Sequence, residues 1–95
     1  SEIYLEFIVF QNPEDPEYFI RNHKVRNISI KTSKNNFVLN KEFKNDNSSQ
    51  WLDINTTTDN LRIDILSAYP SQEYNGKVPF DECAVQEIIF YGRDL

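Results

Sequence analysis

Short segments of alternating apolar and polar residues run through the whole chain, and turn sequences separate them. Alternation with a period of two places the apolar side chains on one face of a β-strand. Strands that recur every 8–12 residues or so are typical of all-β sandwiches, so the sequence predicts an all-β, antiparallel β-sandwich. No segment carries a helical apolar stripe longer than one or two turns. The expected strands are Ile3–Phe10, Val25–Lys31, Phe37–Phe43, Trp51–Ile54, Leu61–Ile65 and Ala84–Tyr91.

The first expected strand is apolar on both faces. Alternate residues from Ile3 to Val9 would form one face, and Ile8 and Phe10 would lie on the other. A strand of this kind is expected at the centre of a sheet, covered on both sides. In the last expected strand, Glu87 should point inward and bond a backbone group or a basic side chain.

Turn and cap residues place the connections. Asp15 can cap a short helical turn over Glu17–Asn22, with Pro16 at its first position. Ser33–Asn36 is expected to form a tight hairpin turn because asparagine tolerates the left-handed conformation. Thr56–Asn60 is expected to be another turn.

Composition limits the possible partners. Ninety-five residues make one small domain, and its formal charge of −5 argues against a nucleic-acid-binding surface or attraction to an anionic membrane. No apolar run is long enough to insert into a bilayer. The single cysteine, Cys83, cannot form an internal disulfide bond. The chain opens directly on strand-like sequence without a secretion signal, so we expect it to be part of a longer protein.

The sequence does not predict an enzyme, a cofactor or a metal site. His23 is the only histidine, and it precedes a strand in a run that looks exposed, so a nucleophilic triad is not expected. Glu82 and Glu87 are five residues apart and would point to opposite faces of a strand, which disfavours a catalytic acid pair. Calcium could still use Asp81, Glu82 and backbone carbonyls as oxygen ligands, and this alternative stays open.

Aromatic residues beside turns suggest recognition of a sugar. An exposed ring can pack on the C–H face of a sugar while nearby polar groups bond its hydroxyls. Tyr18 and Tyr74 are the best candidates because they lie among prolines and polar residues. Trp51, Tyr69 and Tyr91 are expected instead to fill edges of the core.

Two stretches resemble the discoidin-like, NADase-type glycan-binding domains, which belong to the galactose-binding-like, coagulation-factor C-type jelly rolls. The first is Tyr18–Arg26, an aromatic pair, an Asn and a basic-Val-basic lead into a strand. The second runs from Ile63 through Tyr69-Pro70 and Tyr74-Asn75 to Asp81-Glu82-Cys83 and Glu87-Ile88. The likeness spans nearly the whole chain and implies a jelly roll over residues 1–95 that lacks the family's first strands. Residues 71–80 depart from the family's pattern by an insertion.

The resemblance implies a non-catalytic accessory module of a bacterial cell-surface or secreted protein, with a glycan or a partner protein as its ligand. Stacking surfaces would come from Tyr18 and Tyr74, and Arg26 would bind an acidic group. The sugar hydroxyls would bond to Asn22, Asn75 and Asp81. Asn22 and Asp81 could instead serve as turn caps. The alternative function is a protein-interaction or scaffolding domain that positions a neighbouring enzyme or toxin domain. Its apolar strand face would be Ile8 with Phe10, or Ile89 with Tyr91.

Overall fold

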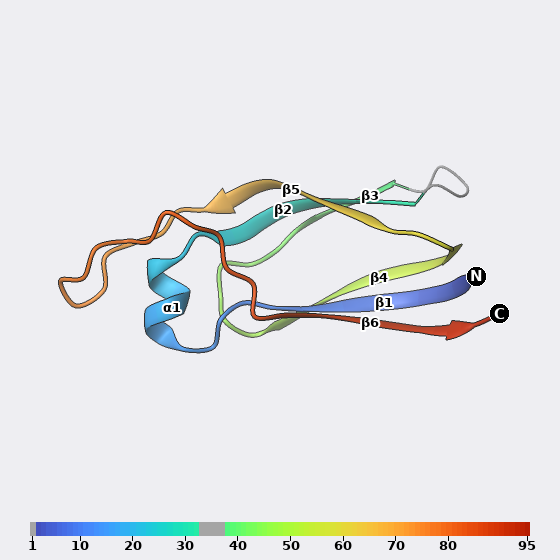
Figure 1. Ribbon diagram of the computed structural model, residues 1–95, viewed down its shortest axis with the longest axis horizontal. Coiled ribbons are helices and arrows are strands. Elements are labelled where there is room, and N and C mark those ends of the chain that lie inside the picture. The colour runs from blue at the N-terminus through green and yellow to red at the C-terminus, as the bar shows by residue number, and fades with distance from the viewer. Residues whose placement is uncertain (1, 33–37) are drawn as a thin grey trace.

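The computed structural model describes residues 2–32 and 38–95, which form one short helix and six strands. Within these residues two three-stranded antiparallel sheets, ordered β4-β1-β6 and β3-β2-β5, lie face to face (Figure 1). This arrangement confirms the predicted antiparallel β-sandwich. The elements are β1 (Ile3–Gln11), α1 (Pro16–Arg21), β2 (Lys24–Lys31), β3 (Val38–Glu42), β4 (Ser49–Thr58), β5 (Arg62–Tyr69) and β6 (Glu87–Asp94).

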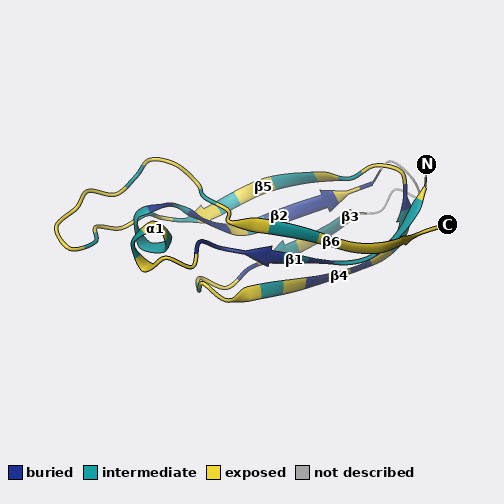
Figure 2. Cartoon of the chain, turned by 60° about the horizontal axis from the view of Figure 1, so that its bottom comes forward, coloured by how far each residue is buried: buried dark blue, intermediate teal, exposed yellow. Residues whose placement is uncertain are grey.

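The core lies between the two central strands, β1 and β2, whose buried residues Figure 2 shows in dark blue. Each central strand contributes three apolar side chains, and β4 and the residue that follows β3 complete the core. Within this core Phe10 and Phe43 stack face to face, with ring centroids 4.4 Å apart. The buried apolar residues are Leu5, Ile8, Phe10, Val25, Ile28, Ile30, Phe43, Leu52 and Ile54.

A β-bulge in β1 changes which of its residues face the core. The register with both neighbouring strands shifts between Leu5 and Phe7, so one extra residue switches the alternation. Leu5 is therefore buried together with Ile8 and Phe10, whereas Phe7 lies on the outer face. The central position of β1 is confirmed, but the expected grouping of Leu5 with Phe7 is wrong.

The helix α1 forms where its capping residues predict it. The Asp15 carboxylate accepts hydrogen bonds from the backbone N–H groups of Glu17 and Tyr18, and Pro16 is the first helical residue. These bonds satisfy donors that the first turn of a helix otherwise leaves free. The helix ends at Asn22, which has extended backbone angles.

Four other expectations fail or lie outside the described residues. Thr56–Thr58 was expected in a turn but lies within β4, where β-branched residues pair with β1. The last strand begins at Glu87 rather than Ala84, and the Glu87 side chain is exposed rather than inward-pointing. The expected hairpin turn at Ser33–Asn36 lies outside the described residues.

The sandwich is less tightly closed on the side where β5 lies opposite β6. Phe90 points between the sheets, opposite Ile8, yet 51% of its surface stays exposed. A cavity of about 490 Å³ lies beside it, lined by residues from the first, fourth, fifth and sixth strands and from the turn before β5. The molecule is 51 Å long, with both termini at one end and α1 towards the other (Figure 1).

Candidate functional site

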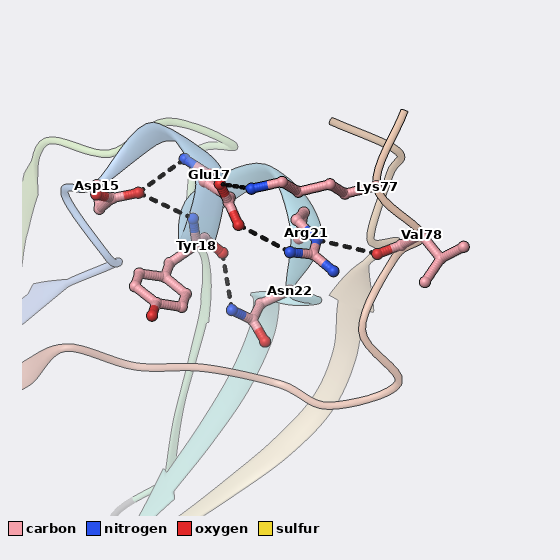
Figure 3. A network of polar contacts seen from close by, with 7 residues as sticks. All are labelled: Asp15, Glu17, Tyr18, Arg21, Asn22, Lys77 and Val78. Carbon is pink, nitrogen blue, oxygen red and sulfur yellow. Dashed lines mark hydrogen bonds and ion pairs between the residues drawn. The ribbon is translucent and has the colours of Figure 1, made fainter. Parts of the chain in front are cut away.

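The helix α1 and the long segment between β5 and β6 pack together through polar contacts (Figure 3). Lys77 Nζ lies 3.0 Å from one Glu17 oxygen, and Arg21 Nη1 lies 2.8 Å from the other. Arg21 Nε also donates to the Val78 carbonyl. These bonds, first from Lys77 and then from Arg21, lower the pKa of Glu17 below its ordinary value. The network fixes the long segment against the helix.

Five of the six predicted site residues lie in α1, at its C-cap or in the segment between β5 and β6, but they differ in accessibility. Tyr18 is 57% exposed and could present its ring to a ligand. Asn22 is only 3% exposed, and its amide Nδ2 donates to the Tyr18 carbonyl 2.8 Å away. In the structure Asn22 therefore caps the helix, and its side chain is not presented at the surface. Tyr74 is half-buried.

The remaining predicted residues are Asn75 and Asp81 in the long segment and Arg26 outside it, and they serve turns and ion pairs or are open to solvent. Asn75 has a φ of 48° and precedes Gly76 in a tight turn, which explains the Asn-Gly pair. Asp81 is fully exposed, with one oxygen 3.6 Å from His23 Nε2. Arg26 lies on β2, where its guanidinium pairs with Glu42 at 3.1 Å. None of the six residues lines any of the five cavities that the structure describes.

A different cavity combines an exposed aromatic ring with polar groups. It has a volume of about 280 Å³ and lies on the side of the sandwich where the edge strands β3 and β4 approach each other. Trp51 is the only aromatic residue in its lining, and it is 62% exposed. The lining consists of Lys41, Lys44, Asp46, Ser48, Ser49, Gln50 and Trp51.

The Trp51 ring belongs to a row of stacked aromatic rings on the outer face of the sheet. It stacks on Phe7 with centroids 4.9 Å apart, and Phe7 stacks in turn on Tyr91 at 4.6 Å. Because β4 is the edge strand of this sheet, no strand of the described chain covers the opposite face of the Trp51 ring. That ring face is open to a ligand, and its orientation is fixed before binding.

Local hydrogen bonds also fix the loop beside Trp51. Gln50 accepts from the Lys44 N–H at 2.7 Å and donates to the Lys44 carbonyl at 2.8 Å. Asp46 accepts from the N–H and the hydroxyl of Ser48. The buried Asn12 donates to the Asp46 carbonyl. The loop is therefore ordered from both ends.

The two lysines of this cavity are the groups most available to a ligand. Neither Lys41 nor Lys44 has an ion-pair partner within the described residues. Two unpaired ammonium groups close to one aromatic ring favour a ligand with negative charge. In the Trp51 cavity only Asp46 opposes this charge.

Sequence reasoning assigned Trp51 to an edge of the core, which the structure contradicts. A signal for its exposure was present, because Leu52 and Ile54 alternate with Trp51 and Asp53 along the strand. Leu52 and Ile54 are buried, so the alternation puts Trp51 on the solvent face with Asp53. The sequence evidence for a binding surface was one large aromatic residue, Trp51, that follows a run of polar residues.

Other chemistry has little support in the described residues. No three His, Cys, Asp or Glu side chains of the described chain gather closely enough to hold a metal ion. His23 accepts a hydrogen bond from the Ser71 N–H through Nδ1, so this nitrogen holds the neighbouring backbone. Partial burial raises the pKa of Cys83, which disfavours a reactive thiolate. No helix in the described part of the chain is long and apolar enough to cross a membrane.

Comparison with protein-family models, with curated proteins and with solved structures finds no match to this chain. The likeness to discoidin-like domains and the jelly-roll connectivity therefore remain predictions. The β-sandwich itself is established by the structure.

Proposed function

We propose that this domain is a non-catalytic glycan-binding module and that Trp51 forms the centre of its binding site. The observation that carries the proposal is the exposed, pre-oriented Trp51 ring beside a polar cavity. Sugars bind to such surfaces because the ring covers their C–H face and polar groups meet their hydroxyls. The resemblance to discoidin-like domains and their extracytoplasmic setting agrees with this function.

The lining of the cavity favours saccharides that carry a carboxylate or sulfate group. Lys41 and Lys44 would bind the negative group, while Asp46 and Ser48 would bond to hydroxyls. The lysines are exposed or partly exposed, so salt should weaken the interaction strongly. A neutral sugar of the same size should bind less tightly.

Trp51 also provides the measurement, because it is the only tryptophan in the chain. Its emission can be followed while oligosaccharides are added, with uronic-acid oligosaccharides, sulfated oligosaccharides and neutral oligosaccharides tested in parallel. Stacking of a sugar should shift the emission to shorter wavelength and protect the ring from acrylamide. Charged oligosaccharides should produce the larger change, and added sodium chloride should reverse it.

Variants separate this site from the one predicted by sequence. Trp51→Ala should abolish binding measured by calorimetry, whereas Tyr18→Ala and Tyr74→Ala should leave the affinity unchanged. Lys44→Gln should weaken charged ligands more than neutral ones. Binding that survives Trp51→Ala but disappears with Tyr18→Ala would overturn the Trp51 site in favour of the loop site. A glycan array without any hit would overturn the function itself.

A protein-interaction domain is the second candidate, and one observation supports it. Of the two strand faces proposed for this role, Ile8 and Phe10 are buried and cannot serve. Tyr91 is 43% exposed and Ile89 is partly exposed, so the face on β6 is accessible. Capture of a partner protein that excess oligosaccharide does not displace would favour this candidate over glycan binding.

A further inference from the structure

The strand β6 has an apolar edge without a strand partner. It pairs with β1 on one side, and no strand of the described chain pairs with its other side. Four consecutive apolar residues, Ile88–Tyr91, occupy the middle of the strand. Exposed edges of this kind present free backbone N–H and C=O groups, and proteins usually protect them with charges, prolines or bulges.

The two faces of β6 carry different side chains. Ile88 and Phe90 point between the sheets, since Phe90 lies opposite the buried Ile8. Tyr91 stacks on Phe7 and therefore lies on the outer face. By alternation, Glu87, Ile89 and Arg93 lie on that outer face as well. The outer face of β6 therefore carries an acidic residue, Glu87, at its start and a basic residue, Arg93, near its end.

We infer that β6 pairs with β6 of a second copy of this chain, antiparallel, with Phe90 opposite Phe90 at a two-fold axis. Such an axis, perpendicular to the sheet, keeps the inner face of one copy next to the inner face of the other. The two three-stranded sheets then become one continuous six-stranded sheet. In this arrangement the backbone N–H and C=O groups on both edges of β6 have hydrogen-bond partners.

Charge complementarity selects this register. With Phe90 on the axis, Glu87 of each copy lies opposite Arg93 of the other, which gives two cross-strand pairs of opposite charge. If Tyr91 were on the axis, Ile89 would face Arg93 and Ile88 would face Asp94. If Ile89 were on the axis, Glu87 would face Tyr91. Only the Phe90 register pairs the charges of the strand.

Both charged groups are available for these pairs. Glu87 is exposed, and none of its contacts within the described chain is an ion pair. Arg93 uses Nη1 to bond Glu6 at 2.6 Å, but its side chain is still largely exposed and has further N–H donors free. Arg93 can therefore bridge Glu6 of its own chain and Glu87 of the second copy.

Apolar contacts favour the same register on both faces. On the outer face Ile89 lies opposite Tyr91, so the row of stacked rings continues into the second copy. On the inner face the two half-exposed Phe90 rings meet, and Ile88 lies opposite Gly92. A glycine there leaves room beside the rings. Apolar surface of Phe90 that borders the cavity between the sheets is buried as a result.

Charge reversal provides a specific test by sedimentation velocity over a dilution series. The unmodified chain should pass from its monomer mass of 11.3 kDa to twice that value as concentration rises. Glu87→Arg places two Arg–Arg pairs in the interface, and Arg93→Glu places two Glu–Glu pairs there. Each change should raise the dimer dissociation constant about tenfold or more. Glu73→Arg, the same change at an exposed loop residue, should leave the constant unaltered.

Mixing the two variants gives the decisive result. A Glu87→Arg chain and an Arg93→Glu chain restore opposite charges at both pairs, so heterodimers should form where neither variant dimerises alone. Circular dichroism confirms that each variant is folded. A chain that stays monomeric up to about millimolar concentration, a dimer that is indifferent to Glu87→Arg, or a mixture without heterodimers would overturn the inference.

Discussion

Phe43 offers the sharpest test of how the two sheets are held together. Its side chain is 1% exposed and stacks on Phe10, so it joins the segment after β3 to the sheet that contains β1. Truncation of a buried phenylalanine to alanine removes its apolar contacts and leaves a cavity, at a cost of about 3–5 kcal/mol. A domain of 95 residues has a free energy of unfolding of about 5–14 kcal/mol. Phe43→Ala should therefore remove about a fifth of the stability or more.

Urea unfolding and thermal unfolding followed by circular dichroism measure this loss. At about 4–8 °C per kcal/mol for a domain of this size, Tm should fall by at least about 12 °C. Trp51→Ala is the matched control, because its ring is mostly exposed and keeps only one stacking contact, worth about 0.5–1.5 kcal/mol. If Phe43→Ala costs no more than Trp51→Ala, the packing of the sheets through Phe43 is refuted.

Three further changes test the bulge, a buried charge and the helix network. Gly92→Ala should destabilise the fold, because its Cβ would lie 2.4 Å from the Tyr4 carbonyl oxygen; a lower urea midpoint checks this, and an unchanged one contradicts it. Burial lowers the pKa of Lys24, so the free energy of unfolding should rise as pH increases from this lowered pKa towards the ordinary lysine pKa. Lys24→Met should abolish that rise, which urea unfolding over a series of pH values checks. Lys77 lowers the pKa of Glu17, so their contact stabilises the fold at pH values above the ordinary carboxyl pKa. This stabilisation is lost as pH falls through the lowered pKa of Glu17. Glu17→Gln should thus reduce the urea midpoint at pH 7 but not near pH 2.

Local patterns predicted the parts of the fold that depend on neighbouring residues. The Asp15 cap and Pro16 located α1 because both act within a single helical turn. Alternation located β2, where Ile28 and Ile30 face the core. These features need no information about the rest of the chain, so one sequence suffices to find them.

Features that arise from pairing between distant strands could not be predicted. The bulge in β1 depends on its register with β4 and β6, and only that register reveals why Leu5 shares a face with Ile8. In β4 the threonine run favoured a turn, although pairing with β1 keeps the segment extended. Pairing with a distant strand therefore outweighed the local preference of these residues for a turn.

The candidate site shows the same division. Residues chosen for their type, such as Asn22 and Asn75, turned out to shape the backbone, because caps and tight turns favour the same polar side chains as sugar sites do. The alternation along β4 indicates that Trp51 is exposed, but only the sheet order shows that β4 is an edge strand. Residue type therefore led only to the proposed class of function, and the proposed position of the site rests on the sheet order.

The two proposals concern opposite edges of one sheet, and this placement has a consequence for binding. Trp51 lies on β4 and the inferred dimer forms through β6, so dimerisation leaves both sites open. A two-fold axis perpendicular to the sheet puts the two Trp51 rings on the same outer face. Five strand spacings separate them, which is about 24 Å. A polymer with repeated charged sugars could bridge both sites and gain affinity from the second, whereas a single oligosaccharide could not. Glu87→Arg should accordingly weaken binding to an immobilised acidic polysaccharide while the affinity for a short soluble oligosaccharide stays the same.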